Sequence, residues 1–426
     1  MSVPMAEFFS VFGRIGIMSF GGPAGQIALM HKVLVDEKKW LEEEQFLHAL
    51  SFCMVLPGPE AMQLATYAGW LKKGVPGGLM AGLLFVLPGA ALITLLSAIY
   101  LQAGETPLVS GLLFGLKAAV LAVVLEALLR VGRRALKTRQ AHVTAYAAFA
   151  AIALLQLPFP LIVLAAAIAG AVLGSGGKPA IAAVKQESVN LVLHGLHVGA
   201  WLAAWLLPLA ALWFALGRAN VFAAEAMFFS KAAAVTFGGA YAVLAYVAQQ
   251  AVEVHGWLKP DEMLTGLGLA ETTPGPLILV LVFVGFLGGA RLGGIGELSG
   301  GLTGAAVTLW FTFVPCFLWV FAGAPFMERL RGVRWLADAL AFVTAAVVGV
   351  IANLALWFGL HVLFGAVADV QLGPLNLPVP DITSLDWRAA LIAAVSIWLL
   401  LFRHWNLMLV LALAAAAGAI LTLGGI

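Results

Sequence analysis

Charged residues are scarce in this chain. Of its 426 residues only 10% are Asp, Glu, Lys or Arg, whereas 62% are hydrophobic, and the mean hydropathy is +1.02. A soluble protein surrounds its core with charged and polar side chains. This composition therefore excludes a soluble globular protein and indicates an integral membrane protein whose partner is the lipid bilayer. The net charge is +2, which gives no reason to expect a nucleic acid as partner.

Cysteine is almost absent as well. Cys53 and Cys316 both lie in apolar stretches, so the sequence predicts no disulfide framework and no cysteine-based metal site. His194 and His197 stand three residues apart, but no acid or cysteine supports them as metal ligands. We therefore expect no metal and no cofactor. No basic segment precedes an apolar core at the start of the chain, so no cleavable signal is expected.

Several catalytic motifs are missing from the sequence. There is no phosphate-binding G-x-x-x-x-G-K-[ST] loop, which argues against ATP as the energy source. There is no G-x-S-x-G elbow and no H-E-x-x-H helix, which argues against an enzyme. An intramembrane enzyme that handles a phosphorylated lipid stays open as the least favoured alternative.

Long apolar runs and an internal repeat are present. The runs approach the ~20 residues that span a bilayer as a helix, and they lack the alternation of barrel strands. Phe20-Gly21-Gly22 aligns with 237–239, Trp40-Leu41 with 257–258, and Pro57-Gly58-Pro59 with 274–276, all in one register. We predict an all-α polytopic membrane protein with two homologous halves, 1–190 and 219–426, and a linker helix within 191–218.

The basic loops indicate that the second half is inverted relative to the first. The densest basic cluster, 130–139, belongs in the cytoplasm by the positive-inside rule, and its counterpart at 357–366 has no Lys or Arg. The loop 103–107 has none either, whereas its counterpart, 324–338, carries three arginines. We therefore predict an inverted-topology repeat with a cytoplasmic N-terminus and a periplasmic C-terminus. About 13 segments result if 8–30 and 46–70 each cross the membrane; both could instead dip in and return. An insertion at 370–388 reads as a loop.

The repeated breaks interrupt helices at membrane depth. Gly-Gly and Pro-Gly-Pro expose backbone N–H and C=O groups that lipid cannot satisfy. A helix that starts after such a break directs N–H groups and its positive dipole end toward one place, which suits an anion. The alternative is a packing kink with close helix contact. Recurrence of both breaks in register favours a binding site.

Three cations lie inside apolar segments, where ionisable groups mark function. Arg14 and Lys231 occupy matching positions ahead of the two Phe-Gly-Gly breaks, and Lys117 lies in an apolar helix. An anionic substrate would pair with them. The alternatives are interfacial positions or acid partners such as Glu7 and Glu225 for the first two, and an acid on another helix for Lys117.

Polar residues also flank the Pro-Gly-Pro breaks. Glu60 and Gln63 follow the first, and Thr272 and Thr273 precede the second together with Glu271. The glutamates could carry protons or cap helices, and the hydroxyls could bind an oxyanion or their own backbone. Glu126 precedes Arg130 by four residues, which predicts a structural ion pair.

At these residues the chain resembles the long-chain chromate ion transporters of the CHR superfamily. The resemblance rests on SFGGPAGQIALMHK, LPGPEAMQ, FVLPG, TFGGAYAVLAYV and ETTPGPLILV, and it covers nearly the whole sequence. It implies a permease of the bacterial inner membrane that exports chromate and confers resistance, with sulfate as a competing anion. The family motifs fall on 20–23, Gln26, 57–60, Gln63, 237–239 and 274–276. The second copy departs from the first at Ala240 and Val280, so the two half-sites are not equivalent.

The predicted substrate-binding residues are Arg14, Ser19, Gly21, Gly22, Gln26, Gly58, Glu60, Gln63, Lys117, Lys231, Thr236, Gly238, Gly239, Thr272, Thr273 and Gly275. A transporter or exchanger of sulfate or another oxyanion, of unknown direction, stays open as the main alternative. A homodimer is an open alternative to a monomer.

Overall fold

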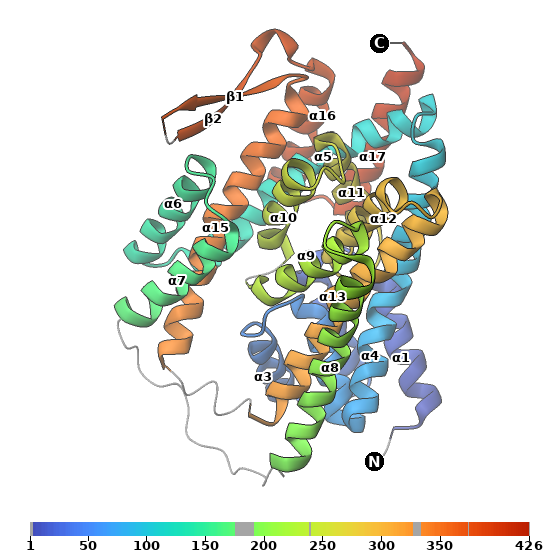
Figure 1. Ribbon diagram of the computed structural model, residues 1–426, viewed down its shortest axis with the longest axis vertical. Helices are drawn as coiled ribbons and strands as arrows, with labels where there is room; N and C mark the ends of the chain where they lie inside the picture. Colours follow the sequence, from blue (N-terminus) through green and yellow to red (C-terminus); the bar gives the residue numbers. More distant parts are fainter. Residues whose placement is uncertain (1–2, 175–190, 238–239, 327–333, 374, 426) are drawn as a thin grey trace. The chain divides into compact units, whose positions relative to one another are not determined.

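A computed structural model describes residues 3–174, 191–237, 240–326, 334–373 and 375–425 of the chain (Figure 1). The chain forms two compact units, and each unit draws on both sequence halves. Unit 1 contains 1–95, 175–240 and 273–337, and unit 2 contains 96–174, 241–272 and 338–426.

Unit 1 is built from helices only, within its described residues. They are α1 (Met5–Met18), α2 (Gly22–His31), the π-helix η1 (Lys32–Glu37), α3 (Glu43–Cys53), most of α4 (Glu60–Ala103), α8 (Leu191–Leu216), α9 (Val221–Val235), the 3-10 helix η3 (Leu277–Leu279), α12 (Val280–Leu292), α13 (Glu297–Gly323) and the 3-10 helix η4 (Ala324–Phe326).

Unit 2 contains helices and one β-hairpin. Its elements are α5 (Pro107–Ala135), α6 (Arg139–Ala153), α7 (Phe159–Leu173), α10 (Ala240–Ala248), the π-helix η2 (Gln249–Val254), α11 (Pro260–Thr272), α15 (Arg334–Leu363), β1 (Val367–Leu372), β2 (Leu375–Pro380), the 3-10 helix η5 (Ile382–Ser384), α16 (Trp387–Ile397), the π-helix η6 (Trp398–Phe402) and α17 (Leu407–Leu423).

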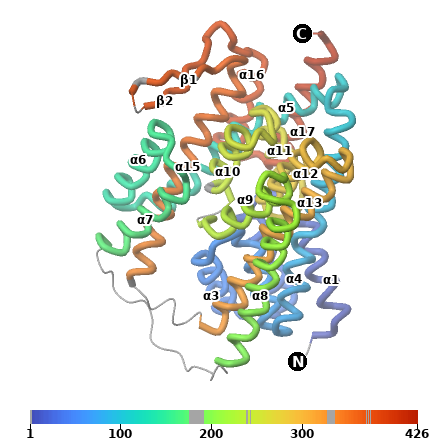
Figure 2. The backbone as a smooth tube through the Cα atoms, in the orientation of Figure 1, coloured from blue at the N-terminus to red at the C-terminus, as the bar shows by residue number. Residues whose placement is uncertain are grey.

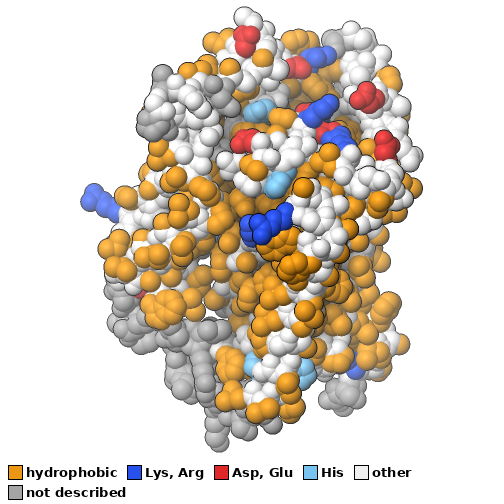
Figure 3. Space-filling model, in the orientation of Figure 1, with side chains coloured by type: hydrophobic (Ala, Val, Ile, Leu, Met, Phe, Trp, Pro, Cys, Tyr) orange, Lys and Arg blue, Asp and Glu red, His pale blue; other side chains and the backbone are white. Residues whose placement is uncertain are grey.

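Five stretches of helix in the described residues are long and apolar enough to cross a membrane: Glu60–Ala103, Pro107–Ala135, Leu191–Leu216, Glu297–Phe326 and Trp335–Leu363. This confirms the prediction of a helical, multi-pass membrane protein. The most apolar window of α8 buries none of its residues inside the protein. Figure 3 shows hydrophobic side chains over much of the face on which α8 lies, as expected of a surface that meets lipid.

The first segment of the chain folds back on itself. At Ser19–Gly21 the helix breaks, and η1 leads back to the beginning of α1, where Lys38 donates to Glu7 at 2.8 Å. The Phe8 ring also stacks on the Trp40 ring, with centroids 5.9 Å apart. Two ends of a 14-residue helix are about 20 Å apart, so these contacts mean that 8–30 forms a hairpin of two short helices.

A second hairpin lies inside α4. Lys73 and Gly74 leave helical geometry, and Gly74 takes a positive φ of 62°. A Cβ on Gly69 would collide with the backbone of Gly77, and one on Gly82 with Thr66 Oγ1. The α4 chain therefore folds back on itself there, and small residues let the two arms approach closely.

The α12–α13 hairpin is closed in the same way. Gly285 and Gly289 on α12 face Gly304 and Gly300 on α13 so closely that a Cβ at Gly285 or Gly289 would meet the facing backbone. The spacing of four residues places both glycines of each helix on one side. This tight contact matters for the buried acid discussed below.

In unit 2 a long helix of each sequence half packs against the last helix of the other half. Gly115 on α5 fits against the backbone of Ala414 on α17, and Gly170 on α7 fits against Asp338 and Ala339 on α15. Figure 2 shows α7 beside α15 along part of its length. The fold of this unit thus depends on contacts between distant parts of the sequence.

The insertion at 370–388 is more ordered than the predicted loop. Strands β1 and β2 pair antiparallel, from Val367 with Pro380 to Leu372 with Leu375. The Thr383 hydroxyl and backbone N–H donate to Asp381 and hold the pKa of this exposed carboxyl below its usual value. Asp386 caps α16 by accepting from the backbone N–H groups of Arg388 and Ala389.

The hairpin of α1 and α2 gives a topology test. Single cysteines at Glu7 and Lys38, in a Cys53→Ser, Cys316→Ser background, should react with an impermeant maleimide from the same side of the membrane. The reason is that η1 brings residue 38 back to residue 7. Labelling from opposite sides would show that 8–30 crosses the membrane.

Candidate functional site

The four helix breaks have two reciprocal hydrogen bonds at their centre, all within unit 1. The Gly58 N–H donates to the Thr236 carbonyl at 2.7 Å, and the Gly275 N–H donates to the Ser19 carbonyl at 2.8 Å. Ser19 and Thr236 are matching positions of the two sequence halves, as are Gly58 and Gly275. The Pro-Gly-Pro segment of each half is thus bound to the Phe-Gly-Gly segment of the other.

The side-chain hydroxyls of Ser19 and Thr236 help to end the helices that precede the breaks. Ser19 Oγ donates to the Ile15 carbonyl at 2.6 Å, and Thr236 Oγ1 donates to the Ala232 carbonyl at 2.5 Å. Each hydroxyl thus bonds back to the last turn of its own helix, which is a usual way to end a helix. Both residues are completely buried, so their main-chain carbonyls need the partner that the other half supplies.

We call the place where the four breaks are hydrogen-bonded to one another the crossing. Two buried glutamines add hydrogen bonds to it, and both come from the first half. Gln26 Nε2 donates to the Gly275 carbonyl at 2.6 Å and to the Ser19 carbonyl at 3.3 Å. Gln63 Nε2 donates to the Pro57 carbonyl at 2.7 Å. The Oε1 atoms of both amides are buried without a partner in the described residues. The matching positions in the second half are apolar, as the sequence shows.

The structure corrects one expectation about the Pro-Gly-Pro breaks. The N–H groups of Gly58 and Gly275 are not free for an anion, because Thr236 and Ser19 occupy them. Both glycines are also packed tightly: a Cβ on Gly58 would lie 2.8 Å from Cys316 Sγ. Positive φ values of 125° and 95° explain why glycine is needed at both places.

The Phe-Gly-Gly break of the first half is more open. Gly21 and Gly22 have φ values of 83° and 73°, and nothing lies within 4 Å of the position that a Cβ would take on either. Helix α2 begins at Gly22 with Pro23 in its first turn and no side-chain cap. The start of α2 is therefore accessible, as an anion site requires. Gly238 and Gly239 lie outside the described residues.

The polar residues around the second Pro-Gly-Pro break have different partners. In unit 2, Thr272 Oγ1 donates to the Leu269 carbonyl at 2.8 Å, and Glu271 accepts from the Tyr241 hydroxyl at 2.6 Å. Thr273 is buried in unit 1. Glu60 begins α4 directly after the first break and is half-buried. The Thr272 hydroxyl therefore binds the backbone of its own helix, which was the alternative to binding an oxyanion.

The three cations predicted to bind substrate differ in their partners. Arg14 is half-exposed and pairs with Glu37 at 3.3 Å, and Lys117 pairs with Asp261 at 3.0 Å in unit 2. Lys231 is exposed and has no ion pair within the described part of the chain. Lys117 therefore pairs with an acid on another helix, which was the alternative to pairing with a substrate anion. The predicted Glu126–Arg130 pair forms at 3.2 Å.

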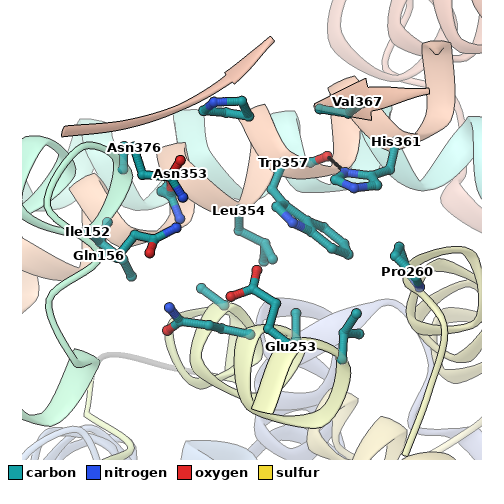
Figure 4. A pocket seen from close by; sticks show the side chains of 16 residues that line it. Ile152, Gln156, Glu253, Pro260, Asn353, Leu354, Trp357, His361, Val367 and Asn376 are labelled. Atoms are coloured by element: carbon teal, nitrogen blue, oxygen red, sulfur yellow. Dashed lines mark hydrogen bonds between the residues drawn. The ribbon is translucent and has the colours of Figure 1, made fainter. Parts of the chain in front are cut away.

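Unit 2 holds a cavity of about 240 Å³, lined by apolar and several polar side chains, that sequence reasoning missed. Gln156, Asn353 and Asn376 gather on one side of it, and Glu253 projects toward them from η2 (Figure 4). At the edge of the cavity, Nδ1 of His361 donates to the Trp357 carbonyl at 2.9 Å. Polar residues within apolar segments were the available signal, but Gln156 lies in the loop between α6 and α7, where polar residues are common, and Asn376 lies in a strand.

Broken helices that meet in the interior, on a multi-pass helical scaffold, are typical of membrane transporters. The comparisons with known proteins give the family. The sequence model described as "Chromate transporter" matches residues 6–171 and 223–419. The chain belongs to the chromate transporter family, and it is a transporter rather than an enzyme.

Individual relatives agree with this assignment. A chromate transport protein of Pseudomonas aeruginosa is 33% identical over 358 residues, which cover 82% of this chain and 80% of the relative. A probable chromate transport protein of Synechococcus elongatus is 27% identical, with 92% and 96% covered. The uncharacterized transporter YwrB of Bacillus subtilis is 32% identical over 136 residues, which are 32% of this chain and 68% of that protein. No solved structure matches the chain.

The crossing predicts different fates for two glycine substitutions. Gly58→Ala should strongly reduce folded protein in the membrane, because its Cβ meets Cys316 Sγ and Gln63 Nε2 at a positive φ. Gly21→Ala places a side chain at a positive φ, which costs about 1–2 kcal/mol of stability, but it causes no clash. This variant should therefore remain folded. Fluorescence-detected gel filtration of tagged protein measures both.

A second substitution tests the cause. The position in the first half that matches Cys316 is Gly89, so Gly58→Ala combined with Cys316→Gly should recover part of the folded protein. Equal losses in Gly58→Ala with and without Cys316→Gly would show that packing against this cysteine is not the reason.

Proposed function

We propose that this protein exports chromate from the cytoplasm across the bacterial inner membrane and thereby confers chromate resistance. The observation that carries the proposal is the crossing of broken helices in unit 1, in a chain whose relatives are named chromate transport proteins. Chromate is a tetrahedral dianion, and it needs positive or N–H-rich surroundings at a place that two membrane sides can reach in turn. Sulfate has the same shape and charge and would compete.

The open start of α2 is the proposed contact for the anion. Gly21 and Gly22 offer backbone N–H groups with no side chain in the way, and the helix dipole adds a positive field. Gln26 and the Gly58–Thr236 and Gly275–Ser19 bonds hold this helix start in position. In this proposal the Pro-Gly-Pro segments position the site, and the Phe-Gly-Gly segment binds.

The two halves are proposed to be related by inverted topology. Three observations support this: the reciprocal bonds at matching positions, the two segments matched by the family, and a relative that aligns with only a third of the chain. The basic loops fall at opposite ends of the two halves, and the positive-inside rule then orients each half in the membrane. The N-terminus is then cytoplasmic and the C-terminus periplasmic, with an odd number of crossings in the chain.

The membrane potential is sufficient to drive this export. Moving one negative charge outward across an inside-negative potential releases about 2.3 kcal/mol of free energy per 100 mV. Moving a dianion releases twice as much, which at 100 mV balances a chromate concentration ratio of roughly 2000-fold. Net export therefore needs no ATP.

We expect less chromate in cells that produce this protein than in cells that produce a Gly21→Val variant, in which a branched side chain blocks the start of α2. Uptake of radiolabelled chromate into everted vesicles measures the direction. Sulfate in tenfold excess should slow this uptake if the two oxyanions share the site. Equal accumulation in both kinds of cell, with protein amounts matched, would contradict chromate export.

Lys231→Gln should weaken chromate transport more than Arg14→Gln or Lys117→Gln. Lys231 lacks a protein partner in the described residues, whereas the other two cations are paired. Loss of one charged hydrogen bond to the anion costs about 1.5–3 kcal/mol, or roughly tenfold to hundredfold in affinity. Concentration dependence of vesicle uptake gives the affinities. A larger effect of Arg14→Gln would place the anion beside α1 instead.

The inverted repeat predicts opposite sides for residues 105 and 335, which lie at matching ends of the long helices α5 and α15. Single cysteines at these positions, in the cysteine-free background, should be labelled by impermeant maleimide from opposite sides of the membrane. Labelling from one side only would exclude the inversion while leaving chromate transport untouched.

A further inference from the structure

Glu225 is a carboxylic acid without a partner in the interior of unit 1. Its side chain is completely buried, and neither oxygen has a hydrogen-bond partner among the residues that the structure describes. It lies on α9, which packs against α8, α12 and α13. Neither the repeat nor the family motifs include it, because its matching position in the first half is Phe8.

Small residues make room for this carboxyl group. A Cβ on Gly304 would lie 3.2 Å from Glu225 Oε2, and Gly304 itself contacts Gly285 on α12. Gly304 is seven residues inside α13, or about 10 Å from the start of that helix. The acid therefore faces α13 where it packs on α12, and the stretch Glu297–Phe326 is long and apolar enough to cross the membrane.

Two more unpartnered polar groups lie on α13, the helix that carries Gly304. Thr308 follows Gly304 by one turn and Thr312 follows by two, so all three occupy one side of α13. Both hydroxyls are buried and have no hydrogen-bond partner in the described part of the chain. Thr308 Oγ1 lies against Gly285. The acid and the two hydroxyls thus form a polar strip in an apolar interior, which we call the α9–α13 strip.

No described cation neutralises Glu225. The charged or titratable groups on α9 and on the helices packed against it are Lys231, Arg291, Glu297, His194, His197 and the buried thiol of Cys316. Lys231, Arg291, Glu297 and His197 are exposed, and Lys231 lies six residues along α9, about 9 Å away. Burying an ionised carboxylate without a partner is costly. The surroundings of Glu225 therefore favour the protonated form in this conformation.

We propose that Glu225 is a proton-binding site that couples proton entry to anion export, an inference that rests on the transport function proposed above. The carboxyl group carries one proton in the conformation described and releases it to water when the helix pair opens toward the cytoplasm. Thr308, one turn from Gly304, then donates a hydrogen bond to the carboxylate until a proton arrives from outside. Outward movement of a dianion and inward movement of a proton shift charge in the same sense, so the potential drives both.

Purified full-length protein in liposomes tests this. The liposomes contain chromate and the pH dye pyranine, and the outside medium is buffered one pH unit lower. We expect proton entry that requires chromate exit, and a final chromate gradient that changes about tenfold per pH unit for one coupled proton. Glu225→Gln mimics the protonated acid and should keep chromate–chromate exchange while losing proton entry and the pH dependence.

Two further variants serve as controls. Glu297→Gln removes an exposed acid at the start of the same helix, α13, and should behave as wild type. Thr308→Val keeps the shape but removes a hydroxyl that supports the ionised form, so it should move the pH optimum of transport to higher pH. The exchange assay also shows that each variant is folded.

The outcomes separate this inference from the proposed function. Chromate exit without proton entry in wild type, or normal proton coupling in Glu225→Gln, would overturn the proton site alone. If only sulfate moves, and Glu225→Gln again loses proton entry, the proton site stands and the chromate assignment falls. No flux of either anion would overturn both.

Discussion

The structure of unit 1 depends on a pair of hydrogen bonds between broken helices. Each Pro-Gly-Pro glycine donates its N–H to the carbonyl that ends a helix in the other half of the sequence. In an apolar interior an unsatisfied peptide group costs several kcal/mol, so neither break is stable without the other. This reciprocity explains why the same two motifs occur twice, and why each sequence half alone leaves its breaks without partners.

The same constraint assigns roles to the glycines. Gly58 and Gly275 are needed because their backbone has positive φ. In addition, Cys316 lies where a side chain on Gly58 would be, and Leu279 lies where one on Gly275 would be. Gly21 has positive φ but open surroundings. A break that is closed by its partner serves as a rigid support, and a break that remains open at a helix start can receive an anion. The repeated motifs therefore have unequal functions.

Small residues determine the rest of the packing. Glycines in α4, α12 and α13 allow helix arms to approach within van der Waals contact of each other's backbone, and similar contacts join α5 to α17 and α7 to α15. In lipid, such close packing replaces the hydrophobic drive that holds soluble helices together. It also creates the space beside Gly304 in which the carboxyl group of Glu225 lies without a partner.

The sequence by itself determined the helical membrane class, the family, and the positions of the breaks. Apolar length, glycine and proline are local properties, and the Glu126–Arg130 pair follows from a spacing of four residues. Only the tertiary structure showed that 8–30 returns as a hairpin, that the N–H groups of Gly58 and Gly275 are occupied, and that Lys117 has Asp261 as partner. It also revealed the β-hairpin at 367–380, the cavity of unit 2 and the isolation of Glu225. These features depend on which distant residues meet, because a hydrogen-bond partner or an empty space far along the chain leaves no trace in the local pattern of a sequence.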